Sequence, residues 1–287
     1  MTRLLALAVL FLATITARAQ IEVDLKFKRL QYIAYEPVIA TVTITNLAGR
    51  EIELRDDTGQ HWYGFEVTAN EGRTLAPLRQ RSEPPLKIAA GTSVTRKIDL
   101  TPLFPITDRG VYHARANVYF ADLNKFFYAR AKVFEVTNAR PIWQRTVGNP
   151  GADGVRTYSL LTNRFPDHTS LYVRVEDKAN SLVYATYSLG RLISFDEPHA
   201  EVDRNNQLHV LQCSAPRLWS YSVVGLDGRL AKHTTYTQTR TSPHLRRAVD
   251  GTVAVAGGMV DAPVAPLASG KEGPKLSDRP ADLPLEN

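Results

Sequence analysis

The chain has 287 residues, of which 44% are hydrophobic and 22% are charged, and its formal net charge is +6. At about 150 residues per domain, this length corresponds to two globular domains. The composition excludes collagen, a coiled coil and a wholly disordered chain. A single cysteine excludes an intramolecular disulfide framework and a cysteine-rich zinc module.

The first residues have the pattern of an export signal. Arg3 precedes the apolar run 4–13, which leads to the small-x-small sequence Ala-Arg-Ala at 17–19, a typical cleavage site. An apolar run of about ten residues is too short for the roughly 20 that span a bilayer. We therefore expect residues 1–19 to be a signal peptide and the mature chain to begin at Gln20. It should be periplasmic or extracellular, with no transmembrane anchor.

Basic and acidic residues are interspersed along the whole chain. There are 35 lysines and arginines against 29 aspartates and glutamates, and the two signs are mixed in every segment. Nucleic-acid binding needs basic charge concentrated on one face or one element. The sequence therefore does not favour DNA or RNA as a partner.

Residues 20–137 alternate apolar and polar side chains with the period of a β-strand. Apolar residues alternate with charged ones over 21–27 and with three threonines over 38–45. Such alternation indicates strands with one buried face. About seven or eight short strands, separated by turns rich in Asn, Asp and Gly, predict an antiparallel sandwich.

Two phrases in this half carry a family resemblance. The sequence Tyr-Glu-Pro-Val at 35–38 leads into a strand that ends at Asn46, and a Gly-x-Tyr at 110–112 begins a later strand. Both phrases resemble those of secreted bacterial immunoglobulin-like domains, including macroglobulin-type and BsuPI-type protease-inhibitor-like modules. The chain has Ala34 or Tyr35 where those domains usually carry Gly. The resemblance implies an immunoglobulin-like fold and carries over no functional residue.

Proline and glycine interrupt the strand pattern between the two halves. Five of them fall within residues 138–155, and such residues punctuate regular structure. We therefore predict a linker over 138–155.

The second half, residues 156–261, contains an imperfect repeat. An aspartate-led turn followed by alternating apolar residues begins at Asp167, Asp203 and Asp250. The unit resembles a β-propeller blade of about 40 to 45 residues. A closed propeller takes at least about four blades, so these would form an open stack or close with another chain. We expect the apolar positions of the repeat to be buried: Leu171, Val173, Leu208, Val210, Val253 and Val255.

Residues 262–287 contain five prolines among alanine, glycine and charged residues. That composition is typical of disorder, so we predict a disordered Pro-rich tail. The predicted fold is therefore all-β, with an N-terminal immunoglobulin-like sandwich followed by a second β-rich domain of blade-like repeats.

The side chains that commonly perform catalysis form no recognisable catalytic motif in this sequence. Cys213 and His209 lie about 13 Å apart on one predicted strand, at roughly 3.3 Å per residue, which is too far for a nucleophile and its base. The seven histidines form no zinc-binding motif. We predict no catalytic residue, no cofactor and no metal site.

One loop of the second half has residue types that could form a calcium site. Asp196, Glu197, Glu201 and Asp203 lie close together in the sequence, and carboxylate oxygens are calcium ligands. The loop lacks the spacing and the glycine of an EF-hand, so we favour a solvated loop between repeats over a calcium site.

Aromatic side chains are the remaining candidates for a binding surface. Trp62, Trp143 and Trp219 offer large rings to a sugar or a protein partner. Trp143 is the least explained, because it falls in the predicted linker, where no strand would bury it.

The sequence favours an exported, non-enzymatic binding or structural protein that contacts another protein or a cell-envelope component. This interpretation follows from fold and destination, and fold alone does not determine function. Two alternatives stay open. A carbohydrate-binding module needs an exposed aromatic platform, and a secreted hydrolase needs dispersed titratable residues to converge in one pocket.

Overall fold

A computed structural model describes residues 20–70, 72–79, 82–148, 154–193 and 196–261. These residues form strands and one short 3-10 helix, so the protein is all-β, as the sequence predicts. Within these ranges no helix is long and apolar enough to cross a membrane. The predicted signal peptide (1–19) and Pro-rich tail (262–287) lie outside the described residues.

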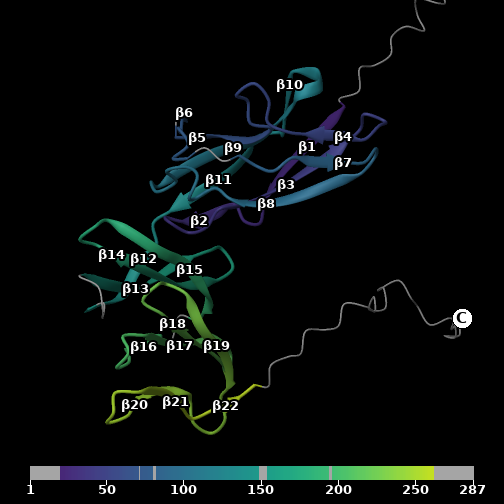
Figure 1. Cartoon of the computed structure of the whole chain (residues 1–287). Coiled ribbons are helices and arrows are strands. Elements are labelled where there is room, and N and C mark those ends of the chain that lie inside the picture. The colour runs from purple at the N-terminus through teal and green to yellow at the C-terminus, as the bar shows by residue number, and fades with distance from the viewer. Residues whose placement is uncertain (1–19, 71, 80–81, 149–153, 194–195, 262–287) are drawn as a thin grey trace, which may run out of the picture.

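Residues 20–137, which we call the first unit, form two facing layers of strands. The strands are β1 Ile21–Phe27, β2 Gln31–Ile33, β3 Ile39–Asn46, β4 Ile52–Leu54, β5 Tyr63–Ala69, β6 Arg73–Thr74, β7 Leu86–Ile88, β8 Ser93–Asp99, β9 Gly110–Phe120, β10 Lys125–Tyr128 and β11 Lys132–Thr137, with the helix η1 at Ala121–Leu123. One layer has the order β1-β3-β8, with the β4-β7 pair beside it, and the other has the order β2-β11-β9-β5-β6, with β10 along β9 (Figure 1).

The two layers enclose one continuous core. In β3, Ala40, Val42 and Ile44 are fully buried, while the threonines between them face outwards and pair with β8, as Thr43 does with Thr95. Burial of each such Val or Ile side chain contributes roughly 1.5–3 kcal/mol. The alternation of this strand, predicted from the sequence, therefore places one complete row of apolar side chains in the core.

Residues 138–261, which we call the second unit, form a succession of stacked sheets. The strands are β12 Arg140–Gly148, β13 Val155–Arg164, β14 Thr169–Asp177, β15 Leu182–Leu192, β16 His199–Val202, β17 Leu208–Ala215, β18 Leu218–Val224, β19 Leu230–Thr237, β20 His244–Arg247, β21 Val253–Ala256 and β22 Met259–Val260. The sheet orders are β12-β13-β14-β15, β16-β17-β18-β19-β22 and β20-β21. Figure 1 shows the three sheets following one another away from the first unit.

The prediction of a linker over 138–155 was wrong for most of that range. Arg140–Gly148 is strand β12, which pairs antiparallel with β13. Pro141 is tolerated because β12 is the edge strand of its sheet, and proline within a sheet is found on edge strands and at bulges. The register also shifts between Pro141 and Trp143, as at a β-bulge. Only residues 138–139 separate β11 from β12.

The apolar positions of the repeat lie between the stacked sheets. Leu171 and Val173 of β14 meet Leu208 and Val210 of β17 in one buried cluster, while Val255 is half-buried against the next layer. The expected burial is confirmed for five of the six positions, with Val253 the fifth. Successive sheets therefore bury their facing sides against one another.

The aspartates that precede these strands occupy turns, as expected. Asp203 Oδ1 accepts hydrogen bonds from the backbone N–H groups of Asn205 and Gln207, at 2.9 and 2.8 Å. Asp250 Oδ1 accepts one from the N–H group of Thr252 at 3.0 Å. Aspartate is favoured at such positions because its side chain satisfies the turn's own backbone.

The two units are in contact through a small mixed interface. Ile33 packs against Leu161 and Tyr172. Around this apolar contact, Arg29 donates to the Tyr172 hydroxyl at 3.2 Å, and Arg174 donates to a backbone carbonyl of the first unit at 2.6 Å. The Tyr172 side chain, expected on the opposite face from Leu171, therefore points towards a second layer.

Candidate functional site

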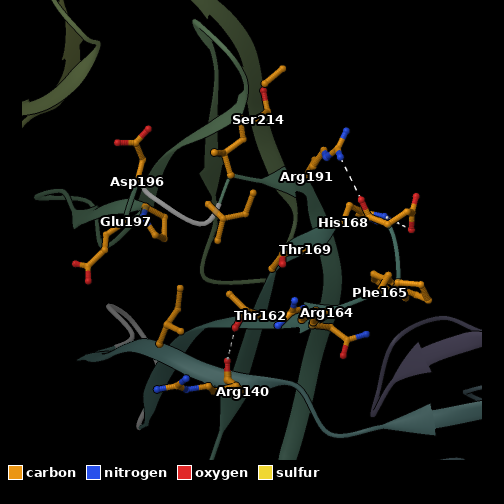
Figure 2. Close-up of a pocket in the computed structure, with 18 of the residues that line it drawn as sticks. Arg140, Thr162, Arg164, Phe165, His168, Thr169, Arg191, Asp196, Glu197 and Ser214 are labelled. Atoms are coloured by element: carbon orange, nitrogen blue, oxygen red, sulfur yellow. Dashed lines mark hydrogen bonds and ion pairs between the residues drawn. The ribbon is translucent and has the colours of Figure 1, made fainter.

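A cleft opens at one end of the second unit, where the start of β12 meets three loops. The loops connect β13 to β14, β15 to β16 and β17 to β18, and the cavity volume is 1380 Å³. This exceeds the roughly 300–1,000 Å³ of a usual small-molecule pocket. Figure 2 shows the side chains of these four segments converging on one space.

The β13–β14 turn builds one wall of the cleft. The turn is closed by a hydrogen bond from the Phe165 N–H group to the His168 carbonyl at 2.8 Å. The Phe165 and His168 rings stack with their centroids 4.9 Å apart. A hydrogen bond from His168, at 2.8 Å, lowers the pKa of the Asp167 carboxyl. Arg191 Nη2 donates to the Asp167 carbonyl at 3.3 Å and joins the turn to β15.

The charged side chains of the cleft are distributed unevenly between its two sides. Arg164 and Arg191 lie on the side of the β13–β14 turn, and Arg140 lies at the base of the view. Asp196 and Glu197 lie on the opposite side, on the loop before β16 (Figure 2). All five are exposed to solvent, and so is the acidic Asp167, which lies on the arginine side in the β13–β14 turn. Such a separation favours a ligand that carries a negative group near one wall and a positive group near the other.

Between these walls, the cleft has apolar surface and one buried amide. Trp143 is half-buried against the core of the second unit, and Ile142 beside it is exposed. Asn163 is buried, and its Nδ2 atom has no hydrogen-bond partner among the described residues. A buried donor without a partner costs about 1–3 kcal/mol.

Two of the three predicted binding aromatics cannot present a ring face to a ligand. Trp62 is 0% exposed and donates from Nε1 to the Glu83 carbonyl at 3.0 Å. Trp219 is 4% exposed and packs in the second unit, between its sheets. Both assignments were wrong because tertiary packing covers the rings. Trp143 lines the cleft, although it lies on a strand and not in a linker.

The four carboxylates of the possible calcium loop do not converge. Asp203 caps its own turn, and its Oδ2 atom faces His209 Nε2 at 3.2 Å. Glu201 pairs with Arg247 at 3.2 Å. In the part of the chain that the structure describes, no group of three or more acidic, histidine or cysteine side chains has the geometry to hold a metal ion.

Cys213 has the environment of a packed core residue. Burial raises the pKa of its thiol, and the nearby Asp196 carboxylate raises it further. A raised thiol pKa leaves little of the nucleophilic thiolate at neutral pH. His209 on the same strand is instead hydrogen-bonded through Nδ1 to the Tyr221 hydroxyl at 2.6 Å. The two side chains therefore do not form a catalytic pair, as their spacing predicts.

The sequence alone did not reveal that three arginines line one cleft. Arg140, Arg164 and Arg191 are far apart in the chain and come from three different elements. None of them belongs to a run of basic residues, so no local pattern marks them. Only the stacking order of the strands brings them to one end of the sheet.

Comparisons with known proteins do not identify a family. No protein-family model matches the chain, and no curated protein matches it closely enough to count as a relative. One solved structure that aligns with it is Spo0M, a sporulation control protein from Bacillus subtilis. The alignment has 10% sequence identity and a TM-score of 0.29, and it covers 59% of this chain and 91% of Spo0M. A score this low establishes no common fold.

Proposed function

We propose that the chain is an exported, non-enzymatic binding protein and that its cleft holds an extended segment of another polypeptide. The observation that carries the proposal is the separation of Arg164 and Arg191 from Asp196 and Glu197 across one cavity of 1380 Å³. A polypeptide segment is the ligand class that can fill a cavity of this volume and also carry charges of both signs.

The remaining lining of the cleft also suits a peptide. Ile142 and Trp143 offer apolar contact for a side chain, and aromatic residues are enriched where proteins bind tightly. Exposed charges at such a site mainly set specificity and association rate.

A hydrolase is less well supported by the same geometry. His168 is the histidine of the cleft, and its partner Asp167 is 83% exposed at the side chain. A carboxylate that orients a catalytic histidine is normally buried. Among the described residues, no hydroxyl or thiol is hydrogen-bonded to His168, so a nucleophile and its base are not paired there.

Export and the finer fold assignments belong to the same proposal. The leader pattern of residues 1–19 supports a periplasmic or extracellular location. Tyr35 adopts φ +66°, a conformation that favours glycine, at the position where the resembled immunoglobulin-like phrase carries Gly. Successive antiparallel sheets β12–β15 and β16–β19 support blade-like repeats.

The proposal is tested with an array of synthetic eight-residue peptides in which one lysine and one aspartate vary in position. The mature chain should bind peptides that carry both charges, and less tightly at high salt. The double variants Arg164→Glu/Arg191→Glu and Asp196→Lys/Glu197→Lys should each weaken binding at least tenfold, which corresponds to about 1.4 kcal/mol.

Arg145→Glu is the matched control, because Arg145 is an exposed arginine of β12 outside the cleft. It should bind the same peptides as the unaltered chain. Equal binding by all four proteins would show that the cleft is not the peptide site.

A further inference from the structure

A second cavity lies in the first unit, and the proposed peptide site does not involve it. Its volume is 340 Å³, and it is bordered by β5, the end of β8 and the segments that follow them. Within the described residues β6 pairs only with Thr68 and Ala69 of β5. The first half of β5 therefore has β9 on one side and this cavity on the other.

The interior of the cavity is aromatic and apolar. Phe65 lies on the inward face of β5 between Tyr63 and Val67, which are both buried, yet Phe65 itself is only half-buried. The core is incomplete at this point because the cavity opens beside the Phe65 ring. Phe126 of β10 is also half-buried and lines the cavity. Two aromatic rings are thus left accessible to a small ligand.

Two neutral amides stand beside these rings. The Asn117 side chain lies over Gly64, where a Cβ atom would come within 2.8 Å of Asn117 Oδ1. Glycine at position 64 is therefore what leaves room for this amide. The side-chain amides of Asn117 and Gln60 make no hydrogen bond to any described residue, and both line the cavity.

The nearest ionic groups are mostly engaged elsewhere. The Glu83 carboxylate pairs with Arg96 at 2.9 Å, and His61 is hydrogen-bonded to Asp56 at 2.9 Å. Arg79 lies exposed at the rim. Apart from Arg79 at the rim, the side chains that line the cavity without a polar partner among the described residues include the Asn117 and Gln60 amides, which suit a neutral ligand with hydroxyl or amide groups.

We propose that this cavity binds one neutral pyranose ring of a carbohydrate, with the ring's apolar face against Phe126 and Phe65 and its hydroxyl groups on Asn117 and Gln60. The volume is near the lower end of the range for small-ligand pockets, about 300–1,000 Å³. A purely apolar ligand would desolvate both amides without replacing their water, at a cost of about 1–3 kcal/mol each. A sugar avoids that cost because its edge carries donors and acceptors.

The test uses nuclear magnetic resonance on the mature chain, with glucose and N-acetylglucosamine as probes and indole as the apolar comparison. Either sugar, at millimolar concentration, should shift the side-chain amide signals of Asn117 and Gln60. Phe126→Ala and Asn117→Ala should each weaken binding at least tenfold. Val111→Ala is the control, because this residue lies on β9, as Asn117 does, but is 44% exposed and outside the cavity, and it should bind like the unaltered chain.

Thermal unfolding of each variant separates loss of the site from loss of the fold. A folded Phe126→Ala chain that binds the sugars normally would overturn the proposal. Binding of indole without either sugar, or no response to any probe, would overturn it too. The outcome is independent of the peptide cleft, because Arg164→Glu/Arg191→Glu should leave sugar binding unchanged.

Discussion

The first unit and the second unit bury their apolar residues in different ways. In the first unit two layers enclose one continuous cluster, which extends from Ile21 to Val136. In the second unit the buried residues fall into separate clusters between successive sheets. The first arrangement makes every core residue depend on both layers, whereas in the second each sheet depends mainly on its neighbours.

This difference explains where the two candidate binding sites are formed. The cavity beside Phe65 is a local defect in an otherwise complete two-layer core. The cleft of the second unit is formed by connections between strands, which the stack aligns at one end. Loops held by a rigid scaffold commonly carry binding residues, and the stack positions them without any contribution from the first unit's core.

The largest expected effect is a truncation in the continuous core. Trp62→Ala removes a fully buried indole and its hydrogen bond and should destabilise the first unit by about 3–5 kcal/mol. Urea unfolding followed by hydrogen exchange should show the change throughout residues 21–137. Val133→Ala, at an exposed position of β11, is the control and should change stability by less than about 0.5 kcal/mol.

A core truncation between two sheets of the second unit should have a slightly smaller and more local effect. Leu208→Ala deletes a side chain that is fully buried between β14 and β17, with an expected cost of about 2–5 kcal/mol. Hydrogen exchange should accelerate in β12–β19 while the first unit keeps its protection. Leu230→Ala, 47% exposed in the same unit, serves as the control. Equal loss of protection in both units would contradict their energetic separation.

The last hairpin of the stack should be the least stabilised element. Leu245 of β20 is only half-buried against the cluster formed by β17 and β18, so Leu245→Ala should cost about 1 kcal/mol, less than at a fully buried leucine. Faster exchange should be confined to β20 and β21. A loss as large as that of Leu208→Ala would show that the hairpin is integral to the whole stack.

A substitution of Tyr187 should change the unfolding free energy little at neutral pH and more clearly at alkaline pH. Burial, and then the charge of Asp227, raises the pKa of Tyr187 from 10.0 to about 12. Folding therefore favours the neutral phenol, and the stability that this provides is present below pH 10 and lost as the pH rises towards 12.

Tyr187→Phe removes that titration and also a buried hydroxyl without a partner among the described residues. Its unfolding free energy should match or exceed that of the unaltered chain at pH 7 by up to about 1 kcal/mol. It should fall less between pH 10 and 12, as measured by urea unfolding. Tyr184→Phe, at an exposed position, should leave the alkaline decline as it is, and an identical decline in both variants would contradict this account.

Local patterns predicted the strands well, because alternation directly reflects burial on one face. The threonines of β3 and the turn at Asp203 follow from chemistry within a few residues. The segment around Pro141 was wrongly predicted to be a linker because its local pattern is ambiguous. Proline and glycine are equally compatible with a linker and with an edge strand. Whether a strand lies at an edge depends on the whole sheet, which no local window contains.

The candidate sites were harder to predict, because burial and proximity are tertiary properties. Trp62 and Trp143 are equally suited to binding by residue type, and only the packing separates the buried ring from the half-buried one. Likewise, Asn117 becomes a candidate ligand only because Gly64 lies directly beside it on the neighbouring strand. The sequence identified the residue types but not their neighbours.

The peptide-binding cleft is tested most directly by hydrogen exchange of the mature chain with and without the tightest-binding peptide of the array. Protection should increase at the four segments that line the cleft, including residues 140–143, 162–169 and 214–216, and should stay unchanged over residues 21–137. Protection confined to the first unit, or none at the cleft under saturating peptide, would contradict the assignment of the binding site to the second unit.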